Sequence, residues 1–207
     1  MKSIVLSPKI KIDQFKKINF IIDEDLSDFI KDLELSIQPI SFKKKYKINF
    51  QNIRSACGLI LAGGGDLYEY KKTNENKIRD DYERYLFNYF LKKKKPILLI
   101  CRGFQLLAKL NNIKLLKIKK HVRKFHLLKL KKSRFIKNKS LHVNSYHNYY
   151  IKRLPKDYVS ISSTKDGSIE IAEHKYKKIL CLMFHPERPM GSKKLILKSL
   201  KKFFSWI

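Results

Sequence analysis

The chain has 207 residues, of which 43% are apolar, and 47 basic and 18 acidic residues give it a formal net charge of +29. We expect residues 1–207 to form a single domain. The longest apolar runs, of five or six residues, are too short for a membrane span or a signal peptide. Three cysteines, an odd number without close spacing, argue against a disulfide framework or a zinc site and predict free thiols in the cytoplasm.

The basic charge is mostly lysine, with 39 Lys against 8 Arg, and it is spread along the whole chain. Recognition of phosphates and bases favours arginine, whereas scattered lysines mostly solvate a surface. We therefore do not expect a nucleic-acid partner. The Lys-rich stretch 117–139 is the segment that we expect to attract an anionic substrate.

Short apolar strands alternate with amphipathic helices in the first half of the chain. The helix expected at 23–35 has Leu26, Phe29, Ile30 and Leu33 at helical spacing. The other expected elements are a strand at 2–10, a buried strand at 56–65 that runs into glycines, a helix at 79–95, a strand at 96–100 and a helix at 102–110.

The second half of the chain is richer in strands. Its expected elements are strands at 125–130, 158–164, 169–174 and 178–184, followed by a helix at 193–204. Alternation of strands and helices predicts an α/β fold whose mostly parallel sheet is covered on both faces. Ligands of such sheets bind beyond the carboxyl ends of the strands, where Cys101 and the glycines 63–65 are expected.

Cys101 stands between an apolar strand and a helix, which is a favourable position for a nucleophile. A sharp turn of this kind holds a side chain exposed, and the first amides of the helix favour a thiolate. Most free cysteines, however, are small residues of the hydrophobic core. The local stretch leaves both interpretations open until partners are found.

Two partners follow in "CLMFHPERP", residues 181–189. A strand that ends near His185 places an imidazole at the same sheet edge, and Glu187 can fix its tautomer. Taken alone, His-Pro-Glu is an ordinary surface turn. Together with Cys101 it predicts a catalytic set of nucleophile, base and orienting carboxylate.

The glycines of "LAGGGDL" can bring backbone N–H groups close to a ligand. A thioester-forming enzyme needs such donors for the oxyanion, and the amide of Arg102 can supply a second one. A simple turn at the end of a strand is the alternative. Phosphate binding is disfavoured, because no Lys-Ser/Thr follows and the dinucleotide spacing is absent.

Six segments in order, "ILAGGGD", "RDDYE", "PILLICRGFQ", "VNSYHNYYI", "DGSIE" and "FHPERP", resemble the class I glutamine amidotransferase superfamily, specifically its γ-glutamyl hydrolase branch. The resemblance covers residues 55–190 approximately. It implies a three-layer α/β/α sandwich of flavodoxin-like type. It also implies a catalytic triad of Cys101, His185 and Glu187, with no cofactor and no metal.

The same resemblance assigns binding roles to further residues. Amides near Gly64 and Arg102 would hold the oxyanion. The residues that would bind the glutamyl group of the substrate are Gly65, Gln105, Asn144, Ser145, Tyr146 and His147.

Other matched residues have less defined roles. Arg79, Asp80 and Glu83 match the family, but their spacing equally suits an exposed ion-pair face of a helix. Asp166, Gly167 and Glu170 match a family turn. His121 and His126 also match, but neither has metal-ligand company in the sequence, and a lone histidine is more often structural.

Two positions depart from the family pattern. Leu99 replaces a glycine that relatives carry two residues before the nucleophile, so the elbow must accommodate a bulky side chain. "NNIKLL" replaces the glycine pair that commonly follows the elbow helix.

The resemblance implies a hydrolase that cleaves a γ-glutamyl amide through a thioester and releases glutamate. The short chain is most similar to hydrolases of γ-glutamyl-CDP-amidate, which yield cytidine diphosphoramidate in capsule polysaccharide modification. A hydrolase of γ-glutamyl polyamine or aminobutyrate conjugates is one alternative. A glutaminase subunit that supplies ammonia to a separate synthetase is another, although we expect no fused synthetase domain. The sequence leaves the oligomeric state undetermined.

Overall fold

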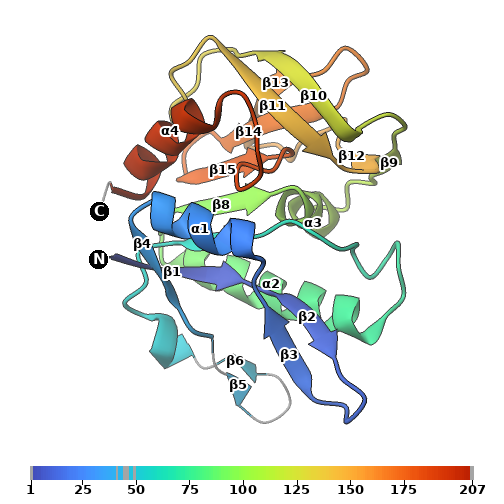
Figure 1. Cartoon of the computed structure of the whole chain (residues 1–207), viewed down its shortest axis with the longest axis vertical. Coiled ribbons are helices and arrows are strands. Elements are labelled where there is room, and N and C mark those ends of the chain that lie inside the picture. Colours follow the sequence, from blue (N-terminus) through green and yellow to red (C-terminus); the bar gives the residue numbers. More distant parts are fainter. Residues whose placement is uncertain (1, 41, 44–46, 49, 206–207) are drawn as a thin grey trace.

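A seven-stranded sheet forms the centre of the molecule (Figure 1). The computed structural model describes residues 2–40, 42–43, 47–48 and 50–205. The strand order is β13-β14-β15-β8-β7-β1-β4, and β14 alone runs opposite to the other six strands. These strands are β1 (Lys2–Ser7), β4 (Leu35–Gln38), β7 (Leu59–Leu61), β8 (Ile97–Ile100), β13 (Tyr158–Ser163), β14 (Ile169–His174) and β15 (Ile179–Leu182).

Helices cover both faces of this sheet, and the expectation of an α/β fold with a mostly parallel sheet is confirmed. In Figure 1, α1 and α4 lie in front of the sheet and α2 and α3 lie behind it. The central strands β7, β8 and β15 are buried along their whole length, as strands covered on both faces must be. The helices are α1 (Glu24–Asp32), α2 (Asn74–Lys92), α3 (Arg102–Leu110) and α4 (Lys193–Ser205).

Local sequence explains the helix boundaries. The hydroxyl of Thr73 accepts a hydrogen bond from the Asn76 amide at 3.2 Å, so α2 begins at Asn74, five residues before the expected start at Arg79. Leu26, Phe29 and Ile30 are buried on one face of α1, as their spacing predicts. The expected helix at 102–110 has the bounds of α3.

The expected strand at 2–10 is divided in the structure. Pro8 has no N–H for a strand ladder, and β1 ends one residue before it. The chain then forms a separate antiparallel hairpin of β2 (Lys9–Ile12) and β3 (Ile18–Ile21). This hairpin, which was not predicted from the sequence, brings Lys9 to the glycine loop at the end of β7.

The remaining strands form small two-stranded units beside the main sheet. The expected strand at 125–130 belongs to β10 (Val122–Lys129), which pairs with β11 (Ser140–Tyr146). The other elements are β9 (Leu116–Lys117) with β12 (Tyr149–Tyr150), β5 (Phe42–Lys43) with β6 (Lys47–Ile48), and a 3₁₀ helix at Phe50–Ile53.

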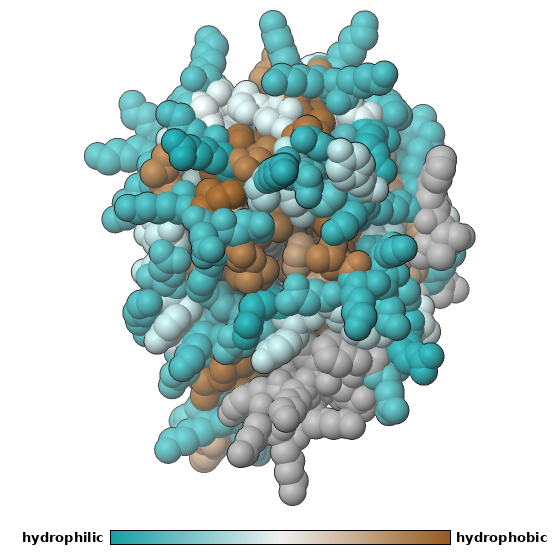
Figure 2. Space-filling view, turned by 180° about the vertical axis from the view of Figure 1, so that it is seen from behind, coloured by the Kyte–Doolittle hydropathy of each residue, from teal (hydrophilic) through white to brown (hydrophobic). Residues whose placement is uncertain are grey.

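The core lies between the sheet and the helices, and it contains the cysteines. Cys57, Cys101 and Cys181 are all free, as expected. The expectation that the turn holds Cys101 exposed is wrong, because its side chain is buried with the other two against the core. Hydrophilic side chains cover most of the face seen in Figure 2, with apolar patches between them. Among the described helices, none combines the length and the apolar character needed to cross a membrane.

Candidate active site

Cys101 occupies a strained turn between β8 and α3. Its backbone has φ 44° and ψ −95°. Positive φ is uncommon for a residue with a Cβ, and a strained residue of this kind costs about 1–3 kcal/mol, so the surrounding packing must hold it. Leu99, the departure from the family pattern, is fully buried in β8, and the turn forms despite its bulk.

Gly103 allows the helix to start this close to the sheet. A Cβ at this position would lie 2.5 Å from the Leu61 carbonyl oxygen, which is far inside van der Waals contact. Only glycine fits there. After α3, Asn112 adopts φ 56°, so the left-handed turn forms in this chain without the glycine pair that the resemblance led us to expect.

His185 lies beside Cys101 and is bound to Glu187. The distance from His185 Nδ1 to Glu187 Oε1 is 2.6 Å, and both side chains are buried. Burial lowers the pKa of His185, but the charges of Cys101 and Glu187 and hydrogen bonds to both outweigh it and raise the pKa to about 10. The raised pKa favours the protonated form of the imidazole beside Cys101 and Glu187.

Asn144 fixes the loop that carries His185. Its side-chain oxygen accepts from the His185 amide at 2.9 Å, and its Nδ2 donates to the His185 carbonyl at 2.8 Å. Asn144 is fully buried. Its side chain thus holds the backbone of His185, a contact different from the glutamyl-binding role that the resemblance implies.

The glycine loop packs directly on the imidazole. A Cβ on Gly63 would lie 2.5 Å from His185 Cε1, and Gly64 and Gly65 have φ 82° and 76°. Arg79 also fixes this loop, because its guanidinium donates to the carbonyls of Ala62, Gly63 and Gly64 at 3.0, 3.2 and 2.6 Å. Because its carbonyls accept hydrogen bonds from Arg79, the loop can direct its backbone N–H groups toward a ligand.

A buried network of opposite charges joins α2 to the elbow. Glu83 binds Arg79 at 2.8 Å and also binds Arg102. Asp80 binds Arg102 at 2.5 Å and Lys109 at 2.7 Å. Arg79, Asp80, Glu83 and Arg102 are at most 7% exposed, so an exposed ion-pair face is the wrong interpretation of Arg79, Asp80 and Glu83. The network fixes the glycine loop and the start of α3 relative to each other.

The expected glutamyl-binding residues separate into two groups. Tyr146 lies beside the proposed catalytic set, with its ring 5.9 Å from that of His185, and Gly65 belongs to the glycine loop. The other group points toward the Tyr149 carbonyl and the loop at His121. Its contacts are Gln105 Nε2 to the Tyr149 carbonyl at 3.1 Å, His147 Nδ1 to the same oxygen at 3.0 Å, and Ser145 Oγ to the His121 carbonyl at 2.7 Å.

His121 lies beside two further possible metal ligands that are distant from it in the sequence. His147 and Glu170 lie around it, and the possible ligand atoms of the three lie within 4.8 Å of one another. The expectation that His121 has no metal-ligand company is therefore wrong. The reason is that β11 and β14, which are distant in sequence, bring the other two residues to the same point.

A narrow crevice of about 10 Å³ lies beside His185. Lys9, Asp23 and Arg188 line it, and no role was predicted for them from the sequence. Arg188 could have been found, since it lies within the motif "FHPERP". Lys9 and Asp23 form an ion pair across the hairpin, and no sequence motif indicates it.

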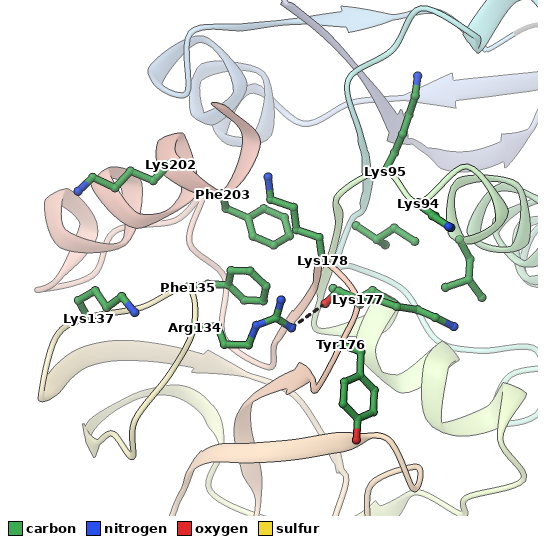
Figure 3. A pocket seen from close by; sticks show the side chains of 13 residues that line it. Lys94, Lys95, Arg134, Phe135, Lys137, Tyr176, Lys177, Lys178, Lys202 and Phe203 are labelled. Carbon is green, nitrogen blue, oxygen red and sulfur yellow. Dashed lines mark hydrogen bonds between the residues drawn. The ribbon is translucent and has the colours of Figure 1, made fainter. Parts of the chain in front are cut away.

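A larger cavity of about 760 Å³ lies at the opposite end of the sheet, by the first residues of β8 and β15 (Figure 3). Six lysines and Arg134 line it, and Phe135 and Phe203 form part of its apolar wall. Arg134 donates to the carbonyls of His174, Lys175 and Lys177. The Lys-rich stretch 117–139 thus contributes two of its cations, Arg134 and Lys137, to the end of the sheet remote from Cys101.

Comparisons with known proteins show the family to which the chain belongs. The profile of the peptidase C26 family matches residues 21–187. The chain is 35% identical over 180 residues to the γ-glutamyl-CDP-amidate hydrolase of Campylobacter jejuni subsp. jejuni serotype O:2, covering 86% of this chain and 84% of that protein. It is 29% identical over 154 residues to a glutamine amidotransferase-like protein of Lactococcus lactis, covering 62% and 65% of the two chains.

Solved structures show the same fold at low sequence identity. A protein described as a GMP synthase subunit, from Thermoplasma acidophilum, matches with a TM-score of 0.73 and 19% identity, covering 99% of this chain and 94% of that one. A glutamine amidotransferase from Thermotoga maritima matches with a TM-score of 0.70 and 16% identity, covering 99% and 96%. With the fold of the class I glutamine amidotransferases and a family match over most of its length, the chain belongs to the peptidase C26 family of hydrolases.

Proposed function

We propose that the protein hydrolyses a γ-glutamyl amide through a thioester on Cys101. The observation that carries the proposal is the meeting of a strained elbow cysteine with the His185 and Glu187 pair, whose side chains are 2.6 Å apart. The C. jejuni relative, at 35% identity over most of both chains, supports the γ-glutamyl amide as the bond that is cleaved.

The first step is attack of the Cys101 thiolate on the γ-carbonyl carbon of the substrate. The C–S bond forms and the carbonyl π electrons move to the oxygen. Backbone N–H groups of Gly64 and Arg102 are the proposed donors to this oxyanion. Arg102 is the first residue of α3, where backbone N–H groups have no acceptor within the helix.

His185 then transfers the proton of its imidazolium ring. Glu187 occupies Nδ1, so Nε2 is the nitrogen that gives its proton to the leaving amide nitrogen as the C–N bond breaks. Neutral His185 next takes a proton from water, whose oxygen attacks the thioester carbon. Glutamate leaves, and the thiolate and imidazolium are restored.

The finer proposal concerns the leaving group. We infer that the substrate is γ-glutamyl-CDP-amidate, which would yield glutamate and cytidine diphosphoramidate for capsule polysaccharide modification in the cytoplasm. The name of the C. jejuni relative supports this substrate. Lys9 and Arg188 line the crevice beside His185, where cations would contact a pyrophosphate-like anion. A cationic polyamine conjugate suits a chain of net charge +29 less well.

Glutamate release from a panel of γ-glutamyl amides tests both levels of the proposal, with Cys101→Ala as the control. We expect γ-glutamyl-CDP-amidate to have the highest kcat/KM. Faster cleavage of γ-glutamyl putrescine would favour the polyamine-type hydrolase, and faster cleavage of glutamine would favour an ammonia-supplying subunit. Equal glutamate release by Cys101→Ala would contradict the mechanism itself.

A further inference from the structure

The three buried residues His121, His147 and Glu170 form a cluster outside the proposed catalytic set. They are 3%, 2% and 0% exposed, and each comes from a different part of the fold. His121 precedes β10, His147 follows β11, and Glu170 belongs to β14. Burying two imidazoles and a carboxylate at one point is costly unless something satisfies them together.

Hydrogen bonds fix which nitrogen of each ring carries a proton. His147 Nδ1 lies 3.0 Å from the Tyr149 carbonyl oxygen, and His121 Nε2 lies 2.7 Å from Asp166 Oδ2. A carbonyl and a carboxylate only accept, so these two nitrogens donate. In the neutral rings, the opposite nitrogens, His147 Nε2 and His121 Nδ1, then carry lone pairs.

These lone pairs face one another and a carboxylate. His121 Nδ1 is 3.4 Å from His147 Nε2, which is also 3.4 Å from Glu170 Oε1. Ser145 gives its hydroxyl proton to the His121 carbonyl, so its Oγ, 3.4 Å from His121 Nδ1, adds another acceptor. Among the described residues, Glu170 Oε2 has no hydrogen-bond partner although it is buried. A positive charge at the centre would satisfy all of these atoms.

Two of the ligand-atom separations, each 3.4 Å, fit a transition metal. Zinc bonds to nitrogen and oxygen ligands of about 2.0–2.1 Å place tetrahedral ligand atoms about 3.3–3.4 Å apart. Two imidazoles and one carboxylate suit zinc better than magnesium or calcium, which prefer oxygen ligands. From this geometry we propose that His121, His147 and Glu170 bind one Zn²⁺, with a fourth position left open.

Each proposed ligand already has the outer partner that metal ligands usually have. Asp166 orients His121, the Tyr149 carbonyl orients His147, and Ser168 donates to Glu170 Oε1 at 2.6 Å. Such partners fix the ring orientation and increase ligand basicity. Two of the 18 acidic residues of a strongly basic chain, Asp166 and Glu170, meet at this cluster.

The position of the cluster gives the metal a role in bracing the active site. The Tyr149 carbonyl, which accepts from His147, also accepts from Gln105 Nε2 at 3.1 Å. Gln105 lies one helical turn after Cys101 on α3. A metal ion would therefore join β11 and β14 beside the elbow helix and hold the Gln105 side chain in place. The metal site itself does not depend on the proposed reaction.

Zinc titration of the chelator-treated, untagged protein, in competition with a chromophoric chelator, tests the proposal. We expect one tight Zn²⁺ per chain in the wild type and in Cys101→Ala. His147→Ala and Glu170→Gln should bind at least about 100-fold more weakly, and Asp166→Asn about 10- to 100-fold more weakly, since it removes only an outer partner. His174→Ala is the matched control, because His174 is also buried and lies on the same strand as Glu170.

A second measurement needs no variant that could unfold. Co²⁺ bound by the wild type should give the visible bands of a tetrahedral site without a thiolate-to-cobalt charge-transfer band, and Zn²⁺ should raise Tm. No stoichiometric binding in the wild type would overturn the proposal. Loss of binding in Cys101→Ala alone would assign the metal to the catalytic thiolate. An NMR spectrum of zinc-saturated protein in which the His121 or His147 ring carries two protons would contradict the proposal. The positive charge at the cluster would then be a proton and not a metal ion.

Discussion

The two ends of the central sheet differ in how they hold charge. At the carboxyl ends of the strands, acidic and basic side chains pair with one another and are almost fully buried, and the crevice beside His185 has a volume of only about 10 Å³. At the amino ends, six lysines and one arginine line a cavity of about 760 Å³, and none of the described residues that line it is acidic. Burying opposite charges is expensive, and folds retain such clusters where position matters. Cavity volume alone would have pointed to the amino ends, away from the proposed catalytic residues.

The largest contrast between the two ends is expected in catalysis. Cys101→Ala should lower kcat for γ-glutamyl amide hydrolysis by a factor of about 10⁴ or more, because the bond-forming atom is lost. Lys178→Ala, at the amino-end cavity, should leave kcat within about two-fold, since surface substitutions have small effects. Steady-state glutamate release measures both. A comparable loss in the two variants would remove the functional distinction between the ends.

The buried ion-pair network of α2 and the elbow should contribute more to the free energy of unfolding than exposed ion pairs do. Glu83→Gln removes the charge that two arginines share, and breaking a buried pair costs about 3–5 kcal/mol in the free energy of unfolding. Asp81→Asn is the matched control on the same helix, because its pair with Arg84 is exposed and worth about 1 kcal/mol or less. Urea unfolding of both variants gives the difference, and equal midpoints would show that the network contributes little.

Glu187→Gln should be less damaging than Cys101→Ala and should change the pH profile. We expect a loss of about 100-fold in kcat, because the orienting group assists the pair that makes bonds. Burial lowers the pKa of His185, but the charges of Cys101 and Glu187 raise it to about 10. The rate should therefore fall as pH rises through this value. Removing one of these charges should move the alkaline limb of kcat/KM to lower pH, and an unmoved limb would argue against the assigned role.

Thiol alkylation sharpens the same comparison without a substrate. Burial raises the pKa of Cys57 and, more strongly, that of Cys181. Cys101, which hydrogen-bonds to His185, should react with iodoacetamide at least about ten times faster than either at neutral pH. Peptide mass mapping after short exposures measures the order, and earlier labelling of Cys57 would contradict it.

The smallest effect is expected at the mouth of the crevice. Lys9→Ala should lower kcat/KM for γ-glutamyl-CDP-amidate by about 3- to 10-fold and reduce its salt dependence, because steering is screened over a Debye length of about 8 Å at physiological salt. Cleavage of glutamine should change less. Lys11→Ala, on the exposed part of the same strand, is the control. Equal salt dependence for both substrates would show that the positive charge of Lys9 does not select the substrate.

Much of the candidate site could be predicted from the sequence, because it depends on where strands end. Cys101, His185 and the glycines 63–65 each follow an apolar run, and parallel strands bring such positions to one edge. The role of Arg79 and Glu83 could not be predicted. Residues spaced i, i+4 form ion pairs on exposed and buried helix faces alike, and only the packing of α2 against the glycine loop decides which it is.

The sequence by itself determined the alternation of strands and helices and the elbow, since periodicity and turn chemistry depend on near neighbours. Tertiary structure decided which distant side chains meet. Lys9 and Asp23, which form an ion pair, are 14 residues apart in the sequence. His121 contacts His147, 26 residues away, and Asp166, 45 residues away. No local pattern encodes such meetings, because they follow from the packing of separate strands and loops around one core.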